Sequence, residues 1–269
     1  MRRKFNFSGS SYVNLNANHP HNLARRHALT IYQANAIYSF IPKNACSTMR
    51  YSLAIDNGFI EGPSQINWIH QNNDAFVANN REAMLASFSF IILRCPYRRI
   101  YSAYMDKLVD MDIQSWELHR ISQYLVHPHE LSFVDFVSML RKPGILNANV
   151  HWRPQSAFQL FKEYDVYYSV EDFGACVRDL KERIGFVVHD ARPLTAHSIS
   201  ELEKIDDGAG YANMTAFEIL RMKKEGRIPS EKAVYSDEMI AAVSEIYRQD
   251  IELYKSRIDP GKLLFEYYK

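Results

Sequence analysis

The sequence is poor in the residues that build glycine-rich loops, disulfide frameworks and membrane spans. Its 269 residues include only 10 glycines and three cysteines, Cys46, Cys95 and Cys176. Scattered cysteines in odd number give no disulfide framework or metal-ligand pattern, and they fit a reducing compartment. No apolar stretch approaches the length of a membrane span, and the basic start of the chain is followed by no signal-peptide core. We therefore expect no membrane span and a cytoplasmic location.

The chain also lacks an excess of charge of either sign. Its 32 Lys and Arg residues nearly balance its 31 Asp and Glu residues, which leaves a formal net charge of +1 at pH 7. This balance does not favour bulk binding to nucleic acid or to a membrane surface, so any anion site must be local. The length and the 47% hydrophobic fraction are those of a soluble globular chain with a large core. We expect a polar N-terminal extension over residues 1–30 and a single domain over residues 31–269.

The most informative stretch is residues 36–50, which predicts a strand, a tight loop and a helix. Ala36–Ile41 is an apolar run rich in β-branched and aromatic residues, typical of a buried strand. Pro42–Ser47 interrupts it, and the apolar spacing from Ser47 onward predicts a helix. This geometry presents backbone N–H groups to an anion, and Lys43 adds a positive charge. The loop has no glycine, so it is not a Walker A loop, and an ordinary turn with a surface lysine is the alternative.

A second stretch repeats the arrangement from residue 88 onward. Phe88–Leu93 is another apolar run typical of a buried strand, and Arg94 follows it directly. Pro96 suits the first turn of a helix, which places Ser102 about two turns along that helix. An arginine at the end of a strand and a serine on the next helix can hold one phosphate together, the arginine through its planar fork.

The apolar run Val166–Val170 is a further strand candidate, and apolar spacing predicts helices over residues 101–126 and 238–254. Strands alternating with helices along the chain predict an α/β fold with a central parallel sheet flanked by helices. In an open α/β sheet the ligand binds beyond the carboxyl ends of the strands. Lys43 and Arg94 both follow such ends in this interpretation, so we expect them to lie at the same edge of the sheet.

Taken in order, these stretches resemble the sulfotransferase superfamily, and most closely its carbohydrate enzymes of the chondroitin 4-O-sulfotransferase type. Pro42–Ser47 resembles the 5′-phosphosulfate loop of the family, and Arg94–Ser102 resembles its 3′-phosphate site. His151–Gln155, Tyr164–Phe173 and Tyr247–Asp250 are similar to further segments of the carbohydrate group. The resemblance implies the P-loop-NTPase-like sulfotransferase fold.

The resemblance also implies an activity: transfer of a sulfuryl group from 3′-phosphoadenosine 5′-phosphosulfate (PAPS) to an acceptor hydroxyl, with no metal required. A carbohydrate acceptor is favoured, and a small metabolite, a lipid or a protein is the alternative. Lys43 would neutralise the leaving 5′-phosphate, as expected for a reaction driven by positioning and charge stabilisation. The donor-binding residues implied by the resemblance are Lys43, Asn44, Ala45, Cys46, Ser47, Thr48, Arg94 and Ser102.

An acceptor hydroxyl needs a general base, and histidine suits this role because its ordinary pKa lies near neutral. His70 is the first choice because the superfamily places its base between the first helix and the strand that ends in the arginine. The alternative for His70 is a solvent-facing or helix-capping role. His151 is second because it lies in a matched segment, and its alternative is a half-buried structural role. Glu61 is third.

Two other classes of function stay open at this point. A nucleotide-dependent kinase would need a glycine-rich loop and a Mg²⁺-binding aspartate after a strand, and neither is apparent. An inactive binding module would be favoured if Lys43, Arg94 and Ser102 did not converge. His127 and His129, on either side of a proline, are more typical of a polar loop than of a metal site.

Overall fold

The structure is a computed structural model that describes residues 3–10, 12–194, 202–207 and 210–265. The chain divides into two compact units. The first comprises Met1–Arg94 and Gln155–Ala196, and the second comprises Cys95–Pro154 and His197–Lys269. The expectation of a single domain over residues 31–269 stays a prediction.

The first unit is built on a four-stranded sheet of order β1–β2–β3–β4. β2, β3 and β4 are parallel, and β1 is antiparallel to β2. This mixed, mostly parallel sheet flanked by helices confirms the α/β fold class. The bounds are β1 Ala28–Ile31, β2 Ala36–Ser39, β3 Phe88–Leu93 and β4 Val166–Ser169. The sequence pattern predicted β2, β3 and β4 but not the four-residue β1.

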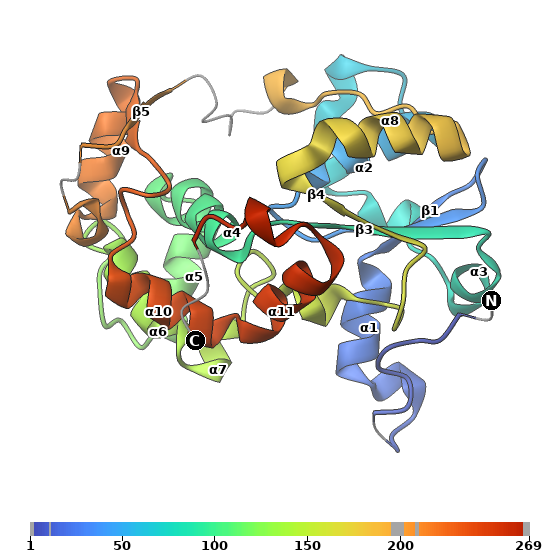
Figure 1. Ribbon diagram of the computed structural model, residues 1–269, viewed down its shortest axis with the longest axis horizontal. Helices are drawn as coiled ribbons and strands as arrows, with labels where there is room; N and C mark the ends of the chain where they lie inside the picture. The colour runs from blue at the N-terminus through green and yellow to red at the C-terminus, as the bar shows by residue number, and fades with distance from the viewer. Residues whose placement is uncertain (1–2, 11, 195–201, 208–209, 266–269) are drawn as a thin grey trace. The chain divides into compact units, whose positions relative to one another are not determined.

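Helices cover the sheet of the first unit, with α2 and α8 on one face (Figure 1). The helices of this unit are α1 His19–Arg26, α2 Cys46–Asp56, α3 Asn80–Leu85 and α8 Phe173–Ile184, with the 3-10 helices η1 Leu15–Ala17, η2 Pro63–His70, η3 Asn73–Phe76, η5 Gln155–Phe158, η6 Val170–Asp172 and η7 Arg192–Leu194. η1 and α1 lie within residues 1–30, so the part that the sequence predicted as a polar extension contains regular helical structure.

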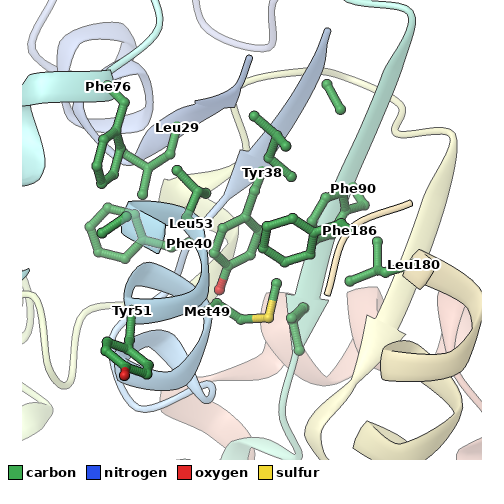
Figure 2. Packing of buried hydrophobic residues seen from close by; sticks show 14 of the residues in the cluster. Leu29, Tyr38, Phe40, Met49, Tyr51, Leu53, Phe76, Phe90, Leu180 and Phe186 are labelled. Atoms are coloured by element: carbon green, nitrogen blue, oxygen red, sulfur yellow. The ribbon is translucent and has the colours of Figure 1, made fainter. Parts of the chain in front are cut away.

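A buried apolar cluster joins α2 and α8 to the strands (Figure 2). Met49 and Leu53 of α2 and Leu180 of α8 pack with Tyr38 of β2 and Phe90 of β3. The rings of Tyr38 and Phe90 stack with their centroids 5.0 Å apart. Burial of such side chains stabilises a fold by roughly 1.5–3 kcal/mol each relative to exposure. The packing therefore fixes α2 on the sheet and determines where its N-terminus lies.

The strand register brings the chain out of β2 and β3 at the same edge of the sheet. Ser39, the last residue of β2, is paired with Ile91 of β3. β3 runs two residues further and ends at Leu93. Lys43 follows the end of β2 by four positions and Arg94 follows β3 directly, so both residues lie beyond the carboxyl ends of parallel strands, as predicted.

The second unit is mainly helical. Its elements are α4 Pro96–Ala103, the π-helix η4 Tyr104–Val109, α5 Ile113–Ile121, α6 Phe133–Leu140, α7 Pro143–Leu146, β5 Glu203–Ile205, η8 Tyr211–Asn213, α9 Ala216–Lys224, β6 Arg227–Pro229, α10 Asp237–Ile246, α11 Arg248–Arg257 and η9 Pro260–Lys262. The continuous helix predicted over residues 101–126 is instead divided among three elements, and the terminal helix predicted over residues 238–254 is divided at Tyr247. None of the described helices is long and apolar enough to cross a membrane.

Candidate functional site

The loop between β2 and α2 has an unusual backbone. Lys43 has φ of 74° and Ala45 has φ of 55°, so two residues with side chains occupy the left-handed region on either side of Asn44. Such conformations cost roughly 1–2 kcal/mol for each non-glycine residue. Successive turns of this kind can aim backbone N–H groups at an anion. The loop therefore adopts, without glycines, the left-handed backbone conformations that occur in anion-binding turns.

Asn44 holds this loop on the sheet. Its side chain is fully buried. Its Nδ2 donates to the backbone oxygen of Ile92, at 2.8 Å, and to Oε1 of Gln155, at 2.7 Å. Ile92 is the second-last residue of β3, so the loop that follows β2 is bonded to the carboxyl end of the neighbouring strand. The side chain of Asn44 therefore has a structural role, and its donor-binding role stays a prediction.

Arg94 lies at the same place and completes a ring of contacts. Its backbone N–H donates to Oε1 of Gln155, at 3.0 Å, and its backbone oxygen accepts from Nε2 of Gln155, at 2.9 Å. Its guanidinium Nη1 donates to the backbone oxygen of Lys43, at 2.8 Å. The structure thus brings Lys43, Asn44 and Arg94 together. Two residues with cationic side chains therefore follow adjacent strand ends at one edge of the sheet.

The helix α2 begins inside the predicted loop. Its first residue is Cys46, one position earlier than expected, and no side chain caps it. Cys46 and Ser47 are partly exposed, so both can face a ligand. Thr48 is buried, and its Oγ1 accepts from the backbone N–H of Ala191, at 3.4 Å. Of the predicted hydroxyl donors, Ser47 is therefore the more accessible.

Residues 189–191 contact the side chains of Thr48 and Ser52 of α2. The sequence did not predict this contact. The backbone N–H of His189 donates to Oγ of Ser52, at 2.8 Å, and the rings of His189 and Tyr51 make an edge contact. Tyr38 lies beneath α2, where burial raises the pKa of its phenol well above its usual value, with the nearby Cys46 as a smaller contribution. This phenol stays protonated at physiological pH.

Ser102 and the neighbouring arginines belong to the second unit. α4 begins at Pro96, as predicted, and Ser102 is its second-last residue and is partly exposed. Arg98 forms an ion pair with Glu231, at 2.7 Å. Arg99 is buried, and its Nη1 and Nη2 donate to the backbone oxygens of residues 153 and 150, at 2.8 and 3.2 Å. Both arginines therefore have structural partners, and binding of a 3′-phosphate by Ser102 stays a prediction.

The two histidines predicted as bases differ in their surroundings. His70 ends η2 in the first unit, and its side chain is exposed rather than directed into the core. His151 lies in the second unit, where its Nδ1 is 2.7 Å from Oδ1 of Asn149. Nδ2 of Asn149 in turn donates to Oε2 of Glu117, at 3.1 Å. Because Asn149 Oδ1 is an acceptor, this pairing assigns the proton to Nδ1 and leaves Nε2 as the basic nitrogen.

The loop that carries His151 is tied down on both sides. Nε1 of Trp152 donates to the backbone oxygen of Ile145, at 2.9 Å, and the backbone oxygen of Trp152 accepts from the Tyr247 hydroxyl, at 2.5 Å. Burial lowers the pKa of the neighbouring Arg153.

Within the described residues, no group of three or more His, Cys, Asp or Glu side chains could hold a metal ion.

Gln155 is the residue at this edge that the sequence did not single out. It appeared only as the last residue of the matched segment His151–Gln155. Its contacts with Asn44 span 111 positions of the chain, so no local pattern could have indicated them. The only sequence signal was its place in that resemblance.

The model of the Sulfotransferase family matches residues 26–255, which include both strand ends, Asn44 and Gln155. No curated protein and no solved structure matches the chain significantly.

Proposed function

The chain belongs to the sulfotransferase family and is an enzyme of that family, and we propose that it uses PAPS as the donor and a carbohydrate hydroxyl as the acceptor. The observation that carries the proposal is the joining of two cationic turns at one edge of the sheet. Arg94 contacts the carbonyl of Lys43 at 2.8 Å, so the two residues proposed to hold the 3′- and 5′-phosphates lie on adjacent turns.

Lys43 is the proposed electrostatic catalyst. It neutralises the charge that develops on the 5′-phosphate oxygen as the bond from this oxygen to sulfur breaks. It is also the proposed source of a proton for that oxygen. The backbone N–H groups at the start of α2 and the Ser47 hydroxyl bind the same phosphate, as is usual for anions at helix N-termini. Removal of one such stabilising group typically lowers turnover by about 10²–10³-fold.

The remaining proposed roles concern register and proton transfer. Arg94 and Ser102 bind the 3′-phosphate and thereby set the position of the donor. The acceptor hydroxyl loses its proton to a histidine as its oxygen forms the new bond to sulfur. His70 is the first proposed base. His151 is the second, and its pairing with Asn149 supports a basic Nε2. A His70→Gln and a His151→Gln variant, compared in turnover at saturating donor, distinguish them.

The carbohydrate acceptor rests on the form of the Pro42–Ser47 loop, which resembles that of the carbohydrate sulfotransferases. A small metabolite, a lipid or a protein is the alternative acceptor. Turnover assays with PAPS and a panel that represents each acceptor class decide among them.

Titration calorimetry with 3′-phosphoadenosine 5′-phosphate, the donor's product, tests the donor site. We expect binding to the wild type in EDTA, and a loss of about tenfold or more in the Lys43→Ala and Arg94→Ala variants, because each removes a charge-assisted contact. Lys162→Ala, which changes an exposed lysine of the same unit, is the matched control and should bind like the wild type. A wild type that binds ATP with Mg²⁺ but not the bisphosphate would overturn the proposal and favour a kinase.

A further inference from the structure

The amide of Gln155 is the centre of the contacts that join the two anion-binding turns. Its side chain is 1% exposed. Its Oε1 accepts from both Asn44 and the backbone of Arg94, and its Nε2 donates to the backbone of Arg94. All of these partners belong to the first unit. The amide of this one side chain therefore bonds both the loop after β2, at Asn44, and the residue that follows β3, Arg94.

These contacts form a closed ring. Gln155 bonds Asn44 and Arg94, Asn44 adjoins Lys43 in the chain, and the guanidinium of Arg94 returns to the Lys43 carbonyl. Asn44 is the only residue between the two left-handed positions, Lys43 and Ala45. A conformation of this kind persists only where its surroundings hold it in place. The bonds of Asn44 to Gln155 and to β3 provide that support.

We propose that Gln155 is a positioning residue, which holds the Lys43 loop and the Arg94 turn in their donor-binding geometry before the donor arrives. This inference rests on the proposed function, because it concerns the same nucleotide site. Gln155 does not touch the reacting atoms. It acts through Asn44 on the loop and through the Arg94 backbone on the arginine. A preformed site binds more tightly because less order has to be gained on binding.

The chemistry of the position favours glutamine. The buried site needs an acceptor for two N–H groups and a donor for one carbonyl, and a primary amide supplies both. A methionine of similar shape supplies no N–H donor and only a weakly accepting sulfur. A buried polar group that loses its partner retains its full desolvation cost. Gln155→Met therefore removes the ring of bonds while it keeps the packing volume.

Two single variants and their combination test the proposal. Gln155→Met and Asn44→Ala each open the ring at one member. The first measurement is amide hydrogen exchange of the peptide covering residues 42–49, without nucleotide. The second is the calorimetric affinity for 3′-phosphoadenosine 5′-phosphate, at a temperature where thermal unfolding shows every variant to be folded.

We expect faster exchange in the peptide and an affinity loss of about tenfold in each single variant, which corresponds to one well-formed hydrogen bond. The affinity of the double variant should be no lower than that of the single variant with the larger loss, because the effects of residues that act as one unit are not additive. If Gln155→Met does not fold, Asn44→Ala alone carries both measurements.

Two controls separate positioning from stability. Gln159→Met makes the same change at a half-buried glutamine one turn further on. Asn57→Ala removes a bidentate asparagine of the same unit, which bonds the backbones of Tyr32 and Thr30. We expect Asn57→Ala to lower the melting temperature but to leave the exchange of residues 42–49 and the nucleotide affinity within twofold of the wild type.

The outcomes also distinguish this inference from the proposed function. If the wild type binds the bisphosphate but Gln155→Met matches it within twofold, the positioning role is overturned, even where the melting temperature falls. If the wild type does not bind, the proposed donor fails, and the exchange measurement decides alone. Faster exchange of residues 42–49 in Gln155→Met would then still show that the ring of bonds holds the loop in place. Unchanged exchange would overturn that role of Gln155.

Discussion

The two turns at the carboxyl edge of the sheet reach similar positions by different means. The turn after β3 leads directly into α4, which opens with Pro96 at its first position. Proline has its φ already fixed for a helix and lacks the N–H that would be unsatisfied there, so this turn is encoded locally. The turn after β2 contains two left-handed residues and no glycine, and it is held by Asn44 and Gln155.

The difference shows how a site can be built on strain that distant residues support. A glycine-rich loop adopts its shape at little steric cost, whereas the loop here needs partners from β3 and from a segment 111 positions away. The gain is a loop with fewer conformations in the absence of ligand. The geometry of the turn after β2 thus depends on the turn after β3, and Arg94 connects the two turns through its bond to the Lys43 carbonyl.

Even a conservative change at Arg94 should have a large effect, because Arg94→Lys breaks this connection while it keeps the charge. Lysine has no planar fork, so it cannot hold the Lys43 carbonyl and bind a phosphate in bidentate fashion at once. We expect the affinity for 3′-phosphoadenosine 5′-phosphate to fall about tenfold by calorimetry, an energy of about 1.4 kcal/mol.

The matched control for this change is Arg183→Lys, at an exposed arginine of the same unit that pairs with Asp179. It should leave the affinity unchanged. An Arg94→Lys variant with wild-type affinity would show that charge alone suffices and that the two turns are independent.

Ala45→Gly tests the strain directly. Glycine adopts a φ of 55° at no steric cost, and the relief of about 1–2 kcal/mol exceeds the entropic penalty of about 0.5–1 kcal/mol for a new glycine. We therefore expect urea unfolding to show a stability gain of about 0.5–1 kcal/mol. The same change at Ala75, an exposed residue whose φ is negative, should instead lower the stability by a similar amount.

The opposite sign of the two changes is the essential result. A loss of stability in both variants would mean that the left-handed backbone at residue 45 carries no strain that glycine can relieve.

The same contrast explains how far the sequence predicted the molecule. The apolar runs of β2 and β3 predicted both strands, and Pro96 marked the start of α4, because these signals are local. β1 was missed because three of its four residues fall within residues 1–30, where the polar composition masks so short an apolar run. The prediction of one continuous helix over residues 101–126 was wrong, because the sequence has no signal for the π-helix at Tyr104–Val109 or for the break after it.

For the candidate site, the positions of the charged residues could be predicted, but the contacts between residues could not. Lys43 and Arg94 could be placed at one edge of the sheet because each follows a strand directly or nearly so. Their roles in donor binding stay predictions. Gln155 could not, because its amide acts only once β3, the loop and residue 155 have come together. Thr48 shows the converse: its hydroxyl suited an anion site, yet in the fold the residue is buried and its Oγ1 bonds residue 191.

An effect that shrinks as the pH falls is expected at the opposite end of β3, where a charged pair has a structural role. Arg3 Nη2 lies 2.7 Å from Oδ2 of Asp165, and this oxygen also accepts from the backbone N–H and the Oγ of Ser89, at 2.7 and 2.9 Å. Burial alone would raise the pKa of Asp165. The bonds from Arg3 and Ser89 outweigh burial and hold its pKa below the usual value.

A carboxyl whose pKa is depressed in the folded state stabilises the fold above its unfolded pKa, near 3.9, and loses that contribution as the pH falls through the folded value.

Because the Asp165 side chain is 44% exposed, solvent screening limits the effect. We expect Asp165→Asn to lower the free energy of unfolding by about 0.5–1 kcal/mol at pH 7 in urea titrations, with the difference shrinking toward pH 3. Glu182→Gln, at an exposed carboxyl of the same unit, is the control and should leave the free energy of unfolding at pH 7 close to that of the wild type. Asp165 bonds Ser89 near the start of β3, whereas Arg94 follows the end of that strand, so Asp165→Asn should leave the nucleotide affinity unchanged. A loss of affinity would show that the two ends of β3 are coupled.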